Sequence, residues 1–123
     1  MEINTEVINK YYVFLIKRVK FYEDDYDATE KALKDRRIDY ITKTEYKNDL
    51  SDDSQEISRL NGVLSELMSY AKDNNIIINT DIKDKINEIN ISGINEMMIK
   101  ELLDNYKKEL SLEKGKTLVK SNN

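Results

Sequence analysis

The sequence predicts an all-α protein: a helical bundle with a long N-terminal helix, an antiparallel second helix and a short C-terminal helical pair. Three observations lead to this fold class. The 123 residues include no proline and only three glycines, so the usual helix breakers are almost absent. Hydrophobic residues make up 39% of the chain, which is enough for one modest core. Apolar side chains also recur with the spacing expected of a helix.

The first expected element is a helix over residues 6–47. If each residue advances about 100° around a helix axis, one face collects a continuous stripe of side chains. The stripe consists of Ile8, Tyr12, Leu15, Val19, Tyr22, Tyr26, Leu33, Arg37, Tyr40 and Thr44. It stays in phase through the acidic stretch FYEDDYDATEKAL, residues 21–33, which is therefore predicted to be helical.

Two signals bear on whether this helix is continuous. Asp27-Ala-Thr-Glu30 has the spacing of a capping box, so a second helix could begin there. One helix is preferred, because a stripe in phase on both sides of a turn would be a coincidence. An unbroken helix would be about 63 Å long. It would then protrude from a compact chain of this size or pack against another chain.

The remaining elements follow in order. Turn residues at 47–56 precede a second helix, Ser54 to Lys72, for which Asp53 and Glu56 form a capping box. Its predicted buried side is Ile57, Leu60, Leu64, Leu67, Met68 and Ala71. Thr80 is the predicted N-cap of a short helix carrying Ile82, Ile86 and Ile89. After Gly93 comes a last helix with Ile94, Met98, Leu102, Tyr106 and Leu110. Residues 1–112 form one domain, and residues 113–123 a flexible basic tail.

An α+β fold with a small sheet is the alternative. Ile76, Ile77 and Ile78 are β-branched and suit a short strand, for which YYVFLI at residues 11–16 would be the partner. The sequence leaves this choice open.

Composition argues against an enzyme or a metalloprotein. The chain has no cysteine and no histidine, so it lacks thiol nucleophiles, the commonest general base and the commonest transition-metal ligands. A calcium loop beginning at Asp25 would place Glu30 where glycine is required and Arg36 where a bidentate glutamate is required. We therefore expect no catalytic residues, no metal and no cofactor.

The same features set an expected location. The start of the chain, MEINTE, is acidic and does not resemble a secretory signal. The apolar run YYVFLI is far shorter than the roughly 20 residues that cross a bilayer. A cytoplasmic protein is expected. Abundant Lys, Ile and Asn indicate A/T-rich codons, hence a low-GC bacterium or one of its phages or mobile elements.

Nucleic-acid binding is disfavoured by charge. Residues 82–103 have the outline of a helix-turn-helix, with Gly93 in the turn. The helix that would enter the groove exposes Glu96 and Glu101 with Lys100 as its lone base, and the chain has a net charge of −4. Carboxylates facing phosphates would be repulsive.

The sequence favours a non-enzymatic protein–protein interaction module, such as an adaptor, an inhibitor or an immunity-type protein. Tyrosine is favoured at half-buried interfaces, although a core edge with outward hydroxyls explains the stripe equally well. The predicted partner-binding residues are Tyr22, Glu23, Asp24, Tyr26, Asp27 and Tyr40. One alternative is a structural component that self-associates as a coiled-coil homo-oligomer, and another is a nucleic-acid-binding regulator. The partner is therefore another protein or a second copy of the chain.

Overall fold

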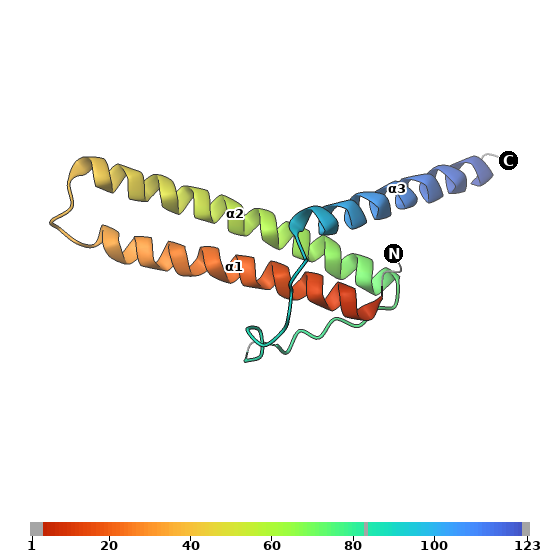
Figure 1. Ribbon diagram of the computed structural model, residues 1–123. Coiled ribbons are helices and arrows are strands. Elements are labelled where there is room, and N and C mark those ends of the chain that lie inside the picture. Colours follow the sequence, from red (N-terminus) through yellow and green to blue (C-terminus); the bar gives the residue numbers. More distant parts are fainter. Residues whose placement is uncertain (1–3, 83, 122–123) are drawn as a thin grey trace.

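The architecture is a helical hairpin crossed by a third helix. A computed structural model describes residues 4–82 and 84–121, with side chains up to residue 113. In these ranges the chain forms three helices, α1 (Thr5–Leu33), α2 (Tyr40–Asp73) and α3 (Glu96–Ser121), and no strand. Helices α1 and α2 run antiparallel along their whole lengths, and α3 leaves the hairpin near its open end (Figure 1). The all-α prediction is confirmed, and the alternative sheet is not supported.

The chain reverses at residues 34–39, so the prediction of one helix over residues 6–47 is wrong. Helix α1 ends at Leu33, and α2 begins after Asp39, whose side chain accepts a hydrogen bond from the Thr42 amide at 2.7 Å. Asp35 holds the turn by accepting from the backbone amide and the guanidinium of Arg37 at 2.9 and 3.1 Å. The acidic stretch at 21–33 is helical as predicted, and the capping box at Asp27 does not start a new helix.

The second predicted boundary is also wrong. Residues 47–56 are helical, so α2 contains 34 residues, and Asp53 lies inside it instead of capping it. The end of α2 agrees with the sequence. Asn75 adopts φ 56°, and the Ile76 amide donates to the Ala71 carbonyl at 2.8 Å, which closes the helix in the manner of a left-handed C-terminal cap.

Residues on α2 that face α1 follow alternating steps of four and three. They are Tyr46, Leu50, Asp53, Ile57, Leu60, Leu64, Leu67 and Ala71. This is the spacing of a coiled-coil seam. The apolar core occupies only the open end of the hairpin and comprises Ile8, Tyr11, Leu15, Val19, Leu60, Leu64, Leu67, Ala71, Ile99, Leu102 and Leu103. Ile57 is partly buried, whereas Met68, predicted to be buried, is exposed.

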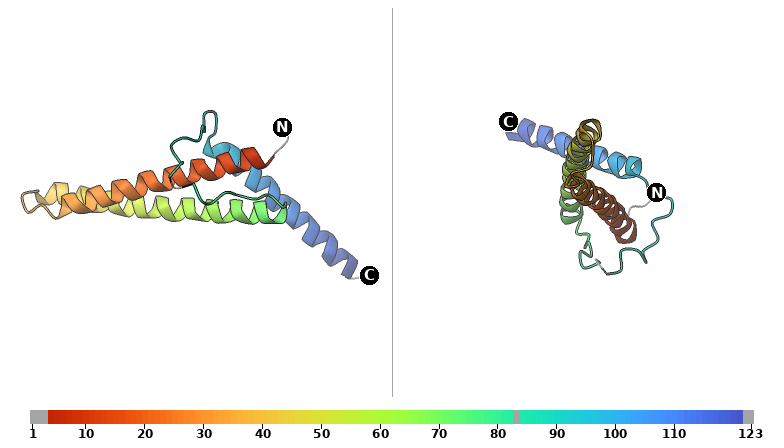
Figure 2. Two further views of the ribbon diagram at one scale, coloured as in Figure 1. Left: turned by 90° about the horizontal axis from the view of Figure 1, so that it is seen from below. Right: turned by 90° about the vertical axis from the view of Figure 1, so that its left-hand side faces the viewer.

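The segment between α2 and α3 crosses α1 and returns to the start of α3 (Figure 2). Its extended part makes no strand; instead, the Asn9 side chain donates to the Ile77 carbonyl and accepts from the Asn79 amide, at 3.1 and 2.8 Å. Residues 84–88 form turns, so Thr80 caps no helix and the predicted helix-turn-helix and C-terminal helical pair are absent from the described residues. Ile82 and Ile86 are nevertheless buried against Val13 of α1, as their spacing predicted.

Helix α3 docks by its first turns only. The Asn95 side chain accepts from the Met98 amide at 3.1 Å and caps the helix, and Gly93 supplies the φ of 81° needed just before it. Ile99, Leu102 and Leu103 are buried against the hairpin, and the rest of α3 projects past its open end (Figures 1 and 2). The backbone is helical to Ser121, across most of the predicted tail at 113–123, whose last two residues are outside the described range. No helix in the described ranges is long and apolar enough to span a bilayer.

Candidate functional site

The hairpin carries an acidic band between its apolar core and its turn. We define it as residues 22–30 of α1 and 48–58 of α2, which lie side by side between the core and the turn (Figure 1). The first segment has five acids and the second has four, with no lysine or arginine in either. The acids are Glu23, Asp24, Asp25, Asp27, Glu30, Asp49, Asp52, Asp53 and Glu56. Like charges at this density repel one another, so the band has a built-in attraction for a positively charged partner.

Asp53 is the centre of the band and occupies a seam position between the helices. Its side chain is buried, with an exposed fraction of 7%, and its Oδ2 atom makes no hydrogen bond to any described residue. Burial raises the pKa of Asp53 to about 6, helped by a hydrogen bond shared with Asp25 and by the charges of Asp25, Asp49 and Asp52. A buried carboxyl group of α2 therefore meets an exposed carboxyl group of α1 at the edge of the seam.

No metal site is evident in the band. Among the residues that the structure describes, no group of three or more acidic, histidine or cysteine side chains is arranged to hold a metal ion.

The structure brings together five of the six predicted partner-binding residues. Glu23, Asp24 and Asp27 are exposed on α1 within the band, and Tyr22 and Tyr26 are half-buried beside them. Tyr40 is separate. It is the first residue of α2, beyond the turn, and it is 83% exposed. The end of α1 lies about 16 Å along the helix from Tyr22, given 1.5 Å per residue. Tyr40 was predicted to lie on the same stripe only because residues 6–47 were expected to form one continuous helix.

A groove adjoins the acidic band. It has a volume of about 490 Å³ and lies between α1, α2 and the crossing segment. Its lining combines an apolar floor with an acidic end: Tyr12, Ile16, Val19, Lys20, Glu23, Asp24, Asn61, Thr80, Ile82 and Ile86. Two of the predicted contact acids, Glu23 and Asp24, thus stand at the edge of an apolar depression. Such a groove suits an apolar side chain that has a basic neighbour.

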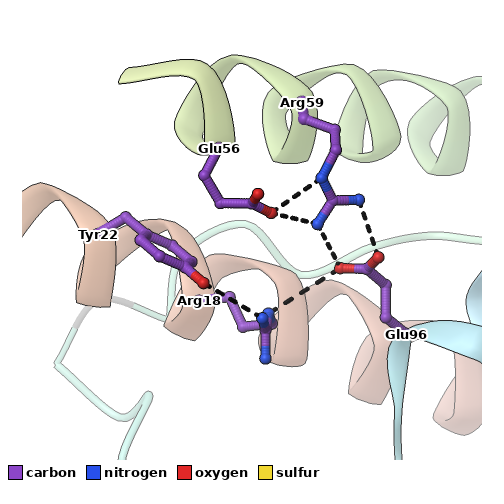
Figure 3. A network of polar contacts seen from close by, with 5 residues as sticks. All are labelled: Arg18, Tyr22, Glu56, Arg59 and Glu96. Atoms are coloured by element: carbon purple, nitrogen blue, oxygen red, sulfur yellow. Dashed lines mark hydrogen bonds and ion pairs between the residues drawn. The ribbon is translucent and has the colours of Figure 1, made fainter. Parts of the chain in front are cut away.

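An ion-pair network closes the band on the side of the core (Figure 3). Arg59 of α2 donates from both Nη atoms to the Glu96 carboxylate of α3, at 2.8 and 2.9 Å, and also donates to Glu56. Arg18 of α1 lies 4.0 Å from Glu96 and donates to the Tyr22 hydroxyl at 3.5 Å. The guanidinium of Arg59 holds the pKa of Glu96 below its usual range. This network joins all three helices at one point.

Sequence reasoning missed this network and the buried role of Asp53. Glu96 was interpreted as an exposed acid of a nucleic-acid-reading helix, whereas the bidentate contact with Arg59 fixes it to α2. Tyr22 lies at the edge of the core: its ring packs on the core residues, and its hydroxyl accepts a hydrogen bond from Arg18.

Comparison with known proteins identifies no relative. The chain matches no protein-family model, and searches of curated proteins and of solved structures returned no match.

Proposed function

We propose that this chain is a non-enzymatic protein–protein interaction module of the adaptor, inhibitor or immunity type. Its binding surface is the acidic band together with the adjoining groove, and its partner is a protein segment that combines basic and apolar side chains. The observation that carries the proposal is the charge pattern: nine acids without one base on two adjacent helical segments, beside an apolar depression. The A/T-rich codon signal keeps a low-GC bacterium, its phages or its mobile elements as the proposed source, and the cytoplasm as the proposed location.

The physical basis of the proposal is electrostatic complementarity. A basic partner would neutralise carboxylates that repel one another in the free protein, so binding relieves a repulsion as well as adding contacts. Exposed charges on this surface would speed association and make it sensitive to salt, because the Debye length is about 8 Å at physiological ionic strength. The groove would then supply the apolar contact area that slows dissociation.

Charge reversal with a matched control tests this function. In the band variant, Glu23, Asp24 and Asp27 are all replaced by lysine. In the control, the exposed acids Asp84, Glu88 and Asp104 are replaced by lysine, which changes the net charge equally on other faces.

Both variants and the wild type are used to capture proteins from the native host. We expect proteins that bind the wild type and the control to be lost with the band variant, and to be released as salt is raised. Equal capture by all three proteins would contradict the proposal.

Self-association is a second candidate, favoured by the charge of the hairpin tip. Residues 31–47 contain six basic and three acidic residues, so the tip of one copy is complementary to the acidic band of another. Tyr40 and Ile41, 83% and 70% exposed at the tip, would become buried in such a contact. Light scattering on a size-exclusion column at low salt and micromolar concentration tests this candidate. A strict monomer would remove it.

A further inference from the structure

A second site lies at the open end of the hairpin, where α3 leaves it. A cavity of about 540 Å³ opens there between all three helices, far along α1 from the acidic band. Its lining includes three tyrosines, one from each helix: Tyr11, Tyr70 and Tyr106. The other lining residues are Asn74, Met98, Glu101, Leu102, Asn105 and Glu109. We call this cavity the tyrosine cage. Its volume falls in the range of small-molecule sites.

Two of the three tyrosine rings meet at right angles. Tyr70 and Tyr106 are 5.3 Å apart between ring centroids, with planes at 89° to each other. The Tyr106 hydroxyl donates a hydrogen bond to the Asp73 carboxylate, which fixes that ring and adds electron density to it. Perpendicular, electron-rich rings attract a cation placed over their faces.

The charge of the cage has one sign. Among the residues that the structure describes, the charged members of its lining are Glu101 and Glu109, and no lysine or arginine lines it. Neither carboxylate forms an ion pair with any side chain that the structure describes. The site is therefore negative and uncompensated, which disfavours an anionic ligand.

Tyr11 forms the α1 wall of the cage. Its side chain is only 4% exposed, and its ring packs in the apolar core beside the cavity. Burial raises the pKa of Tyr11, helped by the negative charge of Glu101, which places that carboxylate near the Tyr11 hydroxyl. Tyr11 therefore adds a rigid aromatic wall to the cage, and the negative charge beside it favours a cation.

We propose that the tyrosine cage binds an organic cation, namely an alkylammonium head group. Three aromatic rings and two carboxylates without compensating bases select for positive charge, and the apolar contribution of Met98 and Leu102 selects for an alkylated cation over a hydrated metal ion. A neutral apolar ligand would bury Glu101 without a partner, which is unfavourable. This site is separate from the acidic band, so a failure of the cation-binding proposal would leave the proposed protein-binding function untouched, and the reverse also holds.

A pair of isosteric ligands tests the proposal directly. Choline and its uncharged isostere 3,3-dimethylbutanol have nearly the same shape, so only the charge differs. Both are titrated into the full chain and followed by the NMR signals of the tyrosine rings. We expect choline to bind and to perturb Tyr11, Tyr70 and Tyr106, with at least about tenfold weaker binding of the alcohol. Equal binding of the two compounds, or no binding of choline at tens of millimolar, would overturn the proposal.

Variants separate a specific site from general attraction to an acidic protein. Glu101→Gln removes a charge from the cage, whereas Asp104→Asn removes one from α3 outside the cage lining. The first is expected to weaken choline binding about tenfold and the second to leave it unchanged. Equal weakening by both would overturn the site assignment. Thermal melts of both variants keep the test valid, since neither exchange removes a buried apolar contact.

One further titration identifies the natural source of the ammonium group. A peptide containing trimethyllysine presents the same head group on a protein chain, and an unmodified lysine peptide serves as its reference. Tighter binding of the methylated peptide than of choline supports the cage as a reader of a protein side chain. Tighter binding of choline supports it as a site for a free metabolite. Binding of the unmodified lysine peptide with no response to choline or to the methylated peptide would overturn the preference for an alkylated cation.

Discussion

The two halves of the α1–α2 hairpin use the same helices and the same seam spacing, but their seams differ in chemistry. In the proximal half, residues 5–19 and 60–73, the seam is filled by buried apolar side chains, and α3 covers it. In the distal half, residues 20–33 and 40–59, Asp53 is the one described side chain that is buried, and the rest of the seam is only partly buried, as at Tyr46, Leu50 and Ile57. The proximal half therefore supplies the stability, and the distal half carries the charge.

This division explains why a small protein can have so long a hairpin. Helix α2 has 34 residues and is therefore about 51 Å long, more than a compact chain of this size would span. The distal half cannot bury enough apolar surface to be stable alone, and it persists because both of its helices continue into the proximal core. Because the proximal core supplies the stability, the distal half can tolerate carboxylates that repel one another on its surface.

Matched leucine truncations should give the largest contrast between the halves. Leu60 is fully buried in the proximal core, so Leu60→Ala should lower the free energy of unfolding by about 2 to 5 kcal/mol. Leu50 is half-buried in the distal seam, so Leu50→Ala should lower it by about 1 kcal/mol. Urea denaturation followed by circular dichroism measures both losses. Equal losses would mean that the distal seam is as important as the core.

Asp53 should make the distal half sensitive to pH. Its pKa is raised from 3.8 to about 6 by burial and by Asp25, so the folded protein holds this proton more tightly than the unfolded chain does. The stability that the protonated group contributes is fully present below pH 3.8 and is lost as the pH rises through 6. The full difference is about 3 kcal/mol, since each pKa unit corresponds to about 1.36 kcal/mol.

A comparison with Asp53→Asn isolates this effect from the other titrating groups. The stability advantage of the variant over the wild type should grow as the pH rises from about 4 through about 6 and stay constant above that, reaching up to about 3 kcal/mol. Glu45→Gln, an exposed acid of α2 whose charge is not among those that raise the pKa of Asp53, is the control and should follow the wild type closely. Parallel pH curves for the wild type and Asp53→Asn would show that Asp53 titrates normally.

The sequence was sufficient for the helical class and for much of the core. Ile8, Leu15 and Val19, chosen by helical spacing, are buried, and so are most of the predicted residues of the second helix. The turn was missed for a specific reason. Arg37 and Tyr40 happen to fall in phase with the stripe, while the Asp39 cap has no glutamate three residues on to mark it.

Asp53 shows where local signals compete. An Asp-Ser pair before an apolar run is typical of a helix start, yet the spacing of Leu50, Asp53, Ile57 and Leu60 is that of a seam. Packing against α1 favours the seam position over the helix start, and a local sequence pattern does not contain that information. The groove and the tyrosine cage were not predictable either, because both depend on where the irregular segment 74–95 crosses α1 and where α3 docks.

Substitutions in the ion-pair network between the two halves should have the smallest effect on the free energy of unfolding, and this network also offers a closely matched control. Arg59 bonds to two glutamates: Glu56 one turn away on α2, and Glu96 at the start of α3. Glu96→Gln removes the charge that fixes α3 to the hairpin and should cost about 1 kcal/mol, reduced by the partial exposure of Arg59. Glu56→Gln removes only a pair within one helix and should cost about 0.3 kcal/mol.

Amide hydrogen exchange should separate the two variants better than total stability does. Loosening α3 should speed exchange in its first turns, so Glu96→Gln should affect residues 98–103, whereas Glu56→Gln should leave them unchanged. Amides nearer the turn, in residues 24–33 and 40–52, should respond to neither variant, because the network lies at the core end of the distal half. If Glu96→Gln instead sped exchange in residues 22–30, the network would stabilise the distal half of the hairpin as well as α3. The two halves would then be one cooperative unit, and the separation of stability from charge argued above would fail.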